Sequence, residues 1–277
     1  GFERNPDVGG IWDIGFAGSP MYESAHFISS KTLSGYRDFP MPDSFPDYPS
    51  HRQILDYLRG YAAKFNVRPR FRFNVSVEGA RADAEGWTLS LSTGEERQYA
   101  GLITAVGCEW RPFAPTWPGS FSGEILHSRD YKHPRQFEGR RVLIVGGGNS
   151  GCDIACDASR SAKKALISLR RGYYFIPKHI FGKPADVFDE EGPRLPYAVE
   201  KPILQLLLRL LNGDVTRLGL PRPDHSILES HPVMNTQILH ALAHGDLEVR
   251  PDVAELRGRE VAFQDGRVEE VDLILLA

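Results

Sequence analysis

The sequence predicts an α/β fold, and the order of its segments carries this prediction. A strand-forming run at residues 141–145 leads directly into Gly146, Gly148 and Gly151, and a helical stretch follows. A second strand-forming run, 165–169, comes after that helix. Strand, turn, helix and strand in this order are typical of a βαβ unit. Hydrophobic residues make up 41% of the chain, which is enough for the packed cores of such a fold.

The spacing of the three glycines indicates what the turn binds. Between a strand and a helix, Gly146 permits a tight turn and Gly148 lets the backbone approach a pyrophosphate, while Gly151 lets the helix pack closely on the strand. The phosphates then lie on the free N–H groups at the positive end of the helix, where Asn149 and Ser150 complete the turn. The alternative is a glycine-rich surface turn, and the flanking strand and helix favour a dinucleotide site.

The end of the next strand indicates which dinucleotide binds. Arg170 and Arg171 follow the run 165–169, where an NAD site usually carries an acid for the ribose 2′-hydroxyl. Arginine suits the 2′-phosphate of NADP instead, so we predict NADPH, with Arg170 as the main contact and Arg171 in support. A solvated basic tip is the alternative.

Length and composition limit the remaining possibilities. A chain of 277 residues suits two α/β domains or one large one. The net charge of −3, with both signs mixed, leaves no basic footprint for nucleic acid or an anionic membrane. No apolar run approaches the ~20 residues of a membrane span. Cys108, Cys152 and Cys156 form no disulfide framework, so a cytoplasmic location is expected, and no metal site is indicated.

The first half of the chain contains a clear helix. Ser50 and Gln53 form a capping box, and apolar residues follow at helical spacing, which predicts an amphipathic helix over 51–65. Glycine turns and strand-forming residues then predict three strands. These strands cover residues 70–78, 86–92 and 100–106.

The second half begins with a crossing between domains at 110–121, which is rich in proline and tryptophan. Residues 178–235 carry many prolines and are predicted to leave the dinucleotide-binding unit as a long excursion. Within it, 203–211 is apolar nearly all round, which indicates a helix buried in the protein or at a subunit contact of a homodimer, with a lid as the alternative. Late strands are predicted over 247–250, 260–263 and 271–276.

Several short motifs together resemble the flavin-containing monooxygenase family. Its signature F-x-G-x-x-x-H-x-x-x-(Y/F) is matched by Phe121, Gly123, His127 and Tyr131, where the related Baeyer–Villiger enzymes generally end on Trp. The resemblance extends over nearly the whole chain. Other segments similar to family landmarks are 9–12, 36–40, 51–65, 105–107, 146–155 and 271–274.

The resemblance implies two Rossmann-like domains, an FAD-binding domain over 1–110 and an NADP-binding domain over 111–277. The first FAD strand and its glycine turn are expected upstream of Gly1, and the chain is expected to continue at both ends. Glu3 falls where the family holds the adenosine ribose, and a backbone contact to the adenine is expected at Val77. The expected contacts to the flavin ribityl and pyrophosphate are Gly10, Ile11 and Trp12.

The resemblance also implies the reaction. Hydride passes from NADPH to FAD, O₂ is activated, and oxygen is transferred to a soft nucleophile, an amine nitrogen or a sulfur of a small-molecule substrate. The cofactors supply this chemistry, so no protein nucleophile is needed. His127 is a catalytic candidate, and a hydrogen-bonded structural histidine is the alternative. Asn235 is a further candidate for the cofactor cleft.

One position departs from the family. Ile28 stands where the family carries an Asn beside the flavin, and isoleucine cannot form the hydrogen bonds of an amide. His26, Ser29 or Ser30 are candidates to replace it. If none does, the alternatives are an uncoupled NADPH oxidase or a non-catalytic, NADPH-sensing flavoprotein.

A pyridine-nucleotide disulfide reductase is a further alternative with the same two-domain plan. That class needs a redox-active cysteine pair. Cys152 and Cys156 are four residues apart on the predicted helix, which favours packing in the core over redox chemistry.

Overall fold

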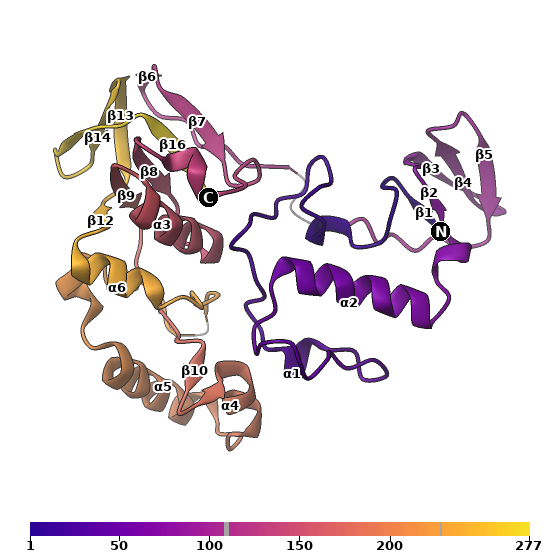
Figure 1. The fold of residues 1–277 in the computed structure, drawn as a ribbon, viewed down its shortest axis with the longest axis horizontal. Coiled ribbons are helices and arrows are strands. Elements are labelled where there is room, and N and C mark those ends of the chain that lie inside the picture. Colours follow the sequence, from indigo (N-terminus) through magenta and orange to yellow (C-terminus); the bar gives the residue numbers. More distant parts are fainter. Residues whose placement is uncertain (108–110, 228) are drawn as a thin grey trace.

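The computed structural model describes residues 1–107, 111–227 and 229–277. Cys108 and the predicted domain boundary at residue 110 lie outside the described residues, and the domain division stays a prediction. Figure 1 shows two lobes side by side, which we call the N-terminal lobe (residues 1–107) and the C-terminal lobe (residues 111–277). Within the described ranges, no helix has both the length and the apolar character needed to cross a membrane.

The main helix of the N-terminal lobe is α2 (His51–Lys64), and its start confirms the predicted capping box. The Ser50 side chain accepts a hydrogen bond from the Gln53 N–H, while the Gln53 side chain accepts one from the Ser50 N–H. Ile54 on the buried face of α2 packs in a small apolar cluster. The short helix α1 (Lys31–Ser34) lies before α2 in the chain.

The strands of the N-terminal lobe agree with the prediction only in part. The predicted strand at 70–78 is divided between a parallel pair and a three-stranded antiparallel sheet, whereas the predicted strand at 86–92 is confirmed as the middle strand of that sheet. The predicted strand at 100–106 is wrong, since no strand forms there and Ile103 is 93% exposed. Residues with high strand propensity form a strand only when a partner strand lies beside them, and the segment 100–106 has none. The strands are β1 (Phe2–Glu3), β2 (Arg72–Phe73), β3 (Val77–Asp83), β4 (Gly86–Leu91) and β5 (Glu96–Tyr99).

A five-stranded parallel sheet forms the core of the C-terminal lobe, in the order β12-β9-β8-β16-β7. Helix α3 (Asn149–Ser161) connects β8 to β9, which confirms the predicted βαβ unit. Its first four strands follow the 3-2-1-4 order of a doubly wound dinucleotide-binding sheet. The strands are β7 (Glu124–His127), β8 (Arg141–Val145), β9 (Lys164–Ser168), β12 (Glu248–Arg250) and β16 (Leu273–Leu276).

A second, four-stranded sheet packs beside the parallel one, in the order β15-β14-β13-β6. The late strands predicted at 247–250, 260–263 and 271–276 correspond to β12, β14 and β16. The other three strands of this sheet were not predicted, because two of them contain charged residues, one has only three residues without charge, and none carries a long apolar run. The strands of this sheet are β6 (Gly119–Phe121), β13 (Val253–Gly258), β14 (Glu260–Phe263) and β15 (Val268–Glu270).

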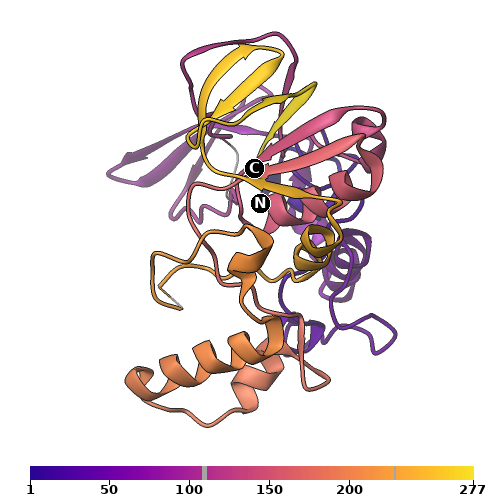
Figure 2. The ribbon, with the colours of Figure 1, turned by 90° about the vertical axis from the view of Figure 1, so that its left-hand side faces the viewer.

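The excursion between β9 and helix α6 (Gln237–His244) carries α5 (Tyr197–Asn212) away from both sheets, as Figures 1 and 2 show. The predicted burial of 203–211 within the chain is wrong: only Leu208 of α5 is buried, and Leu210 is 75% exposed. The helix contacts the rest of the chain through one face, at residues 174–175 and 226–227, so leucines on its other faces stay exposed. The other excursion elements are β10 (His179–Ile180), β11 (Lys183–Pro184) and α4 (Ala185–Glu191). Short 3₁₀ helices of the chain are Gly10–Trp12, Arg68–Arg70, Pro134–Phe137 and Val215–Leu218.

Candidate functional site

The glycine turn lies at the carboxyl end of β8, where doubly wound sheets bind their ligands. Gly146 has a φ of +121°, and a Cβ there would lie 2.0 Å from the carbonyl oxygen of Ala277. A Cβ on Gly151 would lie 2.4 Å from the carbonyl oxygen of Gly146. Both glycines are therefore required by the close packing of the turn on itself and on the end of β16.

Gly148 differs from its neighbours because its side of the turn is open. A Cβ built on Gly148 meets no atom within 4 Å. Gly148 is the N-cap residue of α3, so no side chain at this position caps the first N–H groups of the helix. The positive end of α3 thus faces open space of the kind that a pyrophosphate needs. Asn149 also holds the turn in place, because its side-chain oxygen accepts a hydrogen bond from the Met234 N–H at 2.8 Å, and Ser150 follows it in the first turn of α3.

The two arginines after β9 have different surroundings. Arg170 is exposed, directly beyond buried Leu169. Arg171 is half-buried, lies over the Tyr173 ring at 5.4 Å and donates a long hydrogen bond to Ser230. The Arg171 Nε is buried and has no hydrogen-bond partner. The open cradle at Gly148 and this orphaned donor fit a phosphorylated dinucleotide.

The residues expected to contact FAD lie in the N-terminal lobe, whereas the glycine turn lies in the C-terminal lobe. Glu3 ends β1, and its carboxylate accepts a hydrogen bond from the Asn5 N–H at 2.8 Å. Gly10, Ile11 and Trp12 form a 3₁₀ helix, and a Cβ on Gly10, whose φ is +54°, would meet no atom within 4 Å. Val77 begins β3 and is exposed. These positions offer an open backbone approach at Gly10 and a carboxylate at the end of β1.

Ile28 is 49% exposed, and the structure distinguishes its three polar neighbours. The Ser30 hydroxyl caps α1 by accepting from the Leu33 N–H, and the Ser29 hydroxyl pairs with that of Ser34 at 2.7 Å. His26 is exposed, and desolvation, followed by the charge of Lys178, lowers its pKa. Of the three candidates, His26 is therefore the one that offers a neutral imidazole at neutral pH.

His127 ends β7 and serves the backbone around it. Its Nδ1 accepts a hydrogen bond from the Arg129 N–H at 3.1 Å, and burial lowers its pKa. Only glycine fits at position 123, because a Cβ on Gly123 would lie 2.6 Å from the Asp272 carbonyl oxygen. Tyr131 is fully buried and stacks on Phe137 at 4.8 Å. These contacts are structural, and nothing in them gives His127 a catalytic partner.

The two described cysteines and Asn235 are all engaged in the core. Cys152 and Cys156 are free and buried, and burial raises the pKa of both thiols, that of Cys156 to about 12. Such thiols do not form reactive thiolates at neutral pH. Asn235 is buried: its amide donates to Asp153 at 2.5 Å, and its side-chain oxygen accepts from the Ile238 N–H.

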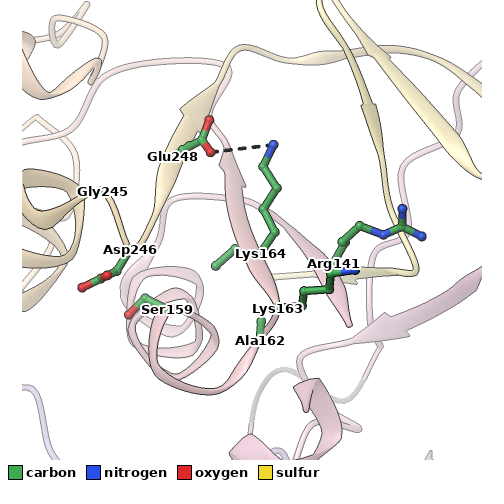
Figure 3. Close-up of a pocket in the computed structure, with 9 residues that line it drawn as sticks. Arg141, Ser159, Ala162, Lys163, Lys164, Gly245, Asp246 and Glu248 are labelled. Atoms are coloured by element: carbon green, nitrogen blue, oxygen red, sulfur yellow. Dashed lines mark ion pairs between the residues drawn. The ribbon is translucent and has the colours of Figure 1, made fainter. Parts of the chain in front are cut away.

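An open groove of about 500 Å³ lies at the opposite end of the parallel sheet (Figure 3). Arg141, Lys164 and Glu248, the first residues of β8, β9 and β12, line it. Two of its cations form ion pairs within the chain, Lys164 with Glu269 at 2.8 Å and Arg141 with Asp272 at 2.7 Å. Because dinucleotides bind at the carboxyl ends of such strands, this groove is not the cofactor site.

Sequence reasoning missed two acidic residues of α3, Asp153 and Asp157, which join the lobes. Tyr22 and Ser24 of the N-terminal lobe donate hydrogen bonds to them at 3.3 and 2.5 Å, respectively. An available signal was their spacing of four residues on a helix in which the residues between and beside them, 151–159, are otherwise small or apolar. Acids at such buried positions need partners from a neighbouring element.

A family model described as flavin-binding monooxygenase-like matches residues 1–277. Human flavin-containing monooxygenase 5 is 32% identical over 303 residues, with all of this chain and 56% of that protein covered. Mouse dimethylaniline monooxygenase [N-oxide-forming] 2 is 33% identical over 301 residues, with the same shares covered. The chain thus spans a little over half the length of these relatives.

Solved structures share the fold at lower identity. A flavin-containing monooxygenase from Stenotrophomonas maltophilia superposes with a TM-score of 0.72 at 22% identity, covering 100% of this chain and 69% of that one. A mutant cyclohexanone monooxygenase from Rhodococcus sp. Phi1, bound to NADP⁺, superposes with a TM-score of 0.77 at 18% identity, covering 66% of that chain. These matches confirm the predicted α/β fold class.

Proposed function

The chain belongs to the flavin-binding monooxygenase-like family, and we propose that its protein is an NADPH-dependent flavoprotein monooxygenase. The proposed reaction transfers one oxygen atom of O₂ to a soft nucleophile, an amine nitrogen or a sulfur of a small molecule. The observation that carries the proposal is the glycine turn, which is open at Gly148, together with the exposed Arg170 that follows β9.

In this proposal the C-terminal lobe holds NADPH. Gly146, Gly148 and Gly151 with Asn149 and Ser150 form the pyrophosphate cradle, because the turn leaves room for phosphate beside the positive end of α3. Arg170 pairs with the 2′-phosphate as a charge-assisted contact. Arg171 supports it through its unpartnered Nε. The domain boundaries of this proposal are 1–110 for FAD and 111–277 for NADP.

The N-terminal lobe holds FAD in this proposal. Glu3 accepts hydrogen bonds from the adenosine ribose, the backbone of Gly10, Ile11 and Trp12 approaches the flavin ribityl and pyrophosphate, and Val77 contacts the adenine through its backbone. Bound together, FAD and NADPH supply the hydride transfer and the activation of O₂. The side chains of this chain bind, orient and keep water away.

Ile28 bears on how well reduction and oxygenation are coupled. An exposed isoleucine excludes water but offers no hydrogen bond, so polar support near it falls to His26. His127 is assigned a structural role, since its Nδ1 is used by the backbone of Arg129. A disulfide reductase is not supported, because both described cysteines are buried with raised pKa values.

The proposal includes a setting for the protein. We place it in the cytoplasm, where free thiols such as Cys152 and Cys156 persist. A homodimer is the proposed assembly, and sedimentation velocity of the full-length protein measures it directly.

The test is NADPH oxidation by the full-length holoenzyme with and without N,N-dimethylaniline or methyl phenyl sulfide. The proposal predicts N-oxide or sulfoxide in a near 1:1 ratio to the NADPH consumed. Hydrogen peroxide as the main product would mean an oxidase. No oxidation of bound or free NADPH would mean a sensing flavoprotein. Either result would overturn the monooxygenase.

A further inference from the structure

Two carboxylates of α3 face the N-terminal lobe from positions one helical turn apart. Asp157 is only 5% exposed, and the residues next to it on the helix are small or apolar. Its carboxylate is therefore buried in a largely apolar part of the helix. Buried carboxylates are costly unless hydrogen-bond donors satisfy them. The donors to Asp153 and Asp157 come from several segments that are far apart in the sequence.

Asp157 connects three segments. Its Oδ2 accepts hydrogen bonds from the Ser24 hydroxyl at 2.5 Å and from the Tyr131 hydroxyl at 3.0 Å, while exposed Arg160 lies 4.0 Å from its Oδ1. Tyr131 is held rigidly, since its ring stacks on Phe137 with an interplanar angle of 8°. The carboxylate thus fixes Ser24 of the N-terminal lobe relative to a rigid ring of the C-terminal lobe.

Asp153 repeats this arrangement one turn nearer the glycine turn. Its carboxylate accepts from the Tyr22 hydroxyl at 3.3 Å and from the Asn235 amide at 2.5 Å. Burial, reinforced by the neighbouring carboxylates, raises the pKa of Tyr22 and of Tyr131. Both phenols therefore remain protonated and keep donating at any pH at which the protein works.

The segment held by these contacts leads to the predicted FAD contacts. The Ser19 hydroxyl donates to the Ile11 carbonyl at 2.5 Å, and the Lys132 ammonium donates to the Ser19 and Met21 carbonyls at 2.5 and 3.1 Å. On the other side, α3 begins at the glycine turn, about 12 Å from Asp157 at 1.5 Å per residue. A short series of hydrogen bonds therefore connects the two predicted cofactor sites.

We propose that Asp157 is a positioning residue: together with Asp153 it holds residues 19–24 against α3 and sets the separation and orientation of the two cofactor sites. This inference rests on the proposed function. Asp157 touches neither predicted site. Removing its hydrogen bonds lets the lobes shift relative to each other, and a misplacement of about 1 Å between reacting groups can lower a rate roughly 100-fold.

The experiment compares Asp157→Ala, Asp157→Asn, Ser24→Ala and Tyr131→Phe in the full-length holoenzyme. We expect the anaerobic rate of flavin reduction at saturating NADPH to fall roughly 10- to 100-fold in Asp157→Ala. Asp157→Asn keeps one acceptor and should lose less. The FAD content and the Kd for NADP⁺ should stay within about twofold of wild type in all four.

The matched control is Tyr48→Phe. The hydroxyl of buried Tyr48 also joins the lobes, by donating to the Lys178 carbonyl and accepting from the Ala185 N–H, but it contacts the excursion and not α3. We expect Tyr48→Phe to reduce the flavin at the wild-type rate. An equal loss in Tyr48→Phe, or no loss in Tyr131→Phe and Ser24→Ala, would overturn the positioning role.

A second readout does not depend on the reaction. Nitroxides at Glu85→Cys and Gln264→Cys, in exposed turns of the two lobes, report the inter-lobe distance by pulsed EPR in a Cys108→Ser background. The distance distribution should broaden or shift in Asp157→Ala and remain unchanged in Tyr48→Phe. If NADPH does not reduce the flavin of the wild-type holoenzyme, the proposed function is wrong. An unchanged distribution in Asp157→Ala contradicts the positioning role by itself.

Discussion

The two lobes bury their apolar residues very differently. In the C-terminal lobe, the central strand β8 carries Val142, Leu143 and Ile144 at 0% exposure, with apolar clusters on both faces of the sheet. The N-terminal lobe has only small clusters around Ile54 and Leu89, and its apolar segment at 102–106 is largely exposed. The C-terminal lobe is thus stabilised by its own core, whereas the position of the N-terminal lobe depends more on polar contacts such as those of Asp157.

The largest expected effect tests this difference in packing. Ile144→Ala removes a fully buried side chain from the larger apolar cluster on one face of the sheet, and we expect a loss of unfolding free energy near the upper end of the ~2–5 kcal/mol range for such substitutions. Ile54→Ala in α2 should lie near its lower end, since fewer neighbours surround the cavity. Denaturant unfolding of each variant measures both losses. A larger loss for Ile54→Ala would reverse the comparison of the lobes.

A smaller effect separates structural from ligand-binding glycines within the C-terminal lobe. Gly151→Ala places a Cβ 2.4 Å from the Gly146 carbonyl oxygen and should cost about 1–3 kcal/mol of stability, as overpacking does. Gly148→Ala meets no protein atom and should leave the unfolding free energy unchanged. Its methyl group occupies the pyrophosphate approach, so the affinity for NADP⁺ should fall about tenfold or more, or ~1.4 kcal/mol. Calorimetric titration and thermal unfolding measure the pair, and unchanged affinity in Gly148→Ala would place the pyrophosphate elsewhere.

Short sequence motifs predicted those parts of the structure that depend on residues close together in the chain. The capping box of Ser50 and Gln53 predicted the start of α2, and the glycine spacing predicted the β8–α3 turn, because each depends on residues within one or two turns of chain. The exposed Arg170 also lies where the end of β9 was predicted to place it.

Features that depend on distant partners were missed or wrong. The segment 100–106 has strand composition but no strand beside it. The apolar helix α5 packs through one face only, which composition cannot reveal. The hydrogen bonds of Asp157 join residues separated by 26 and 133 positions, and only the folded arrangement brings them together.

The smallest expected effect is electrostatic and concerns pH. Side-chain and backbone hydrogen bonds from Arg141 lower the pKa of Asp272 well below its ordinary 3.8. A lowered pKa stabilises the fold above the unfolded-state value, and this contribution is lost as the pH falls through the folded-state pKa. Asp272→Asn should therefore lower the thermal midpoint at pH 7 by a few degrees and have progressively less effect below pH ~4.

Asp83→Asn in the N-terminal lobe is the matched control. Its carboxyl also has a lowered pKa, chiefly through the Glu85 N–H, but it is fully exposed to solvent. We expect a smaller shift of the midpoint for Asp83→Asn than for Asp272→Asn at pH 7. Equal shifts would mean that the buried sheet adds nothing to the strength of the Arg141–Asp272 pair.

The central claim is that the C-terminal lobe binds NADPH, and Arg170→Ala in the full-length holoenzyme tests it most directly. Loss of one charge-assisted contact, about 1.5–3 kcal/mol, predicts a roughly 10- to 150-fold weaker Kd for NADPH. The Kd for NADH should be nearly unchanged, because NADH has no 2′-phosphate, and Arg171→Ala should show the same preference more weakly. Equal weakening of both cofactors in Arg170→Ala would contradict the assignment of NADPH to this site.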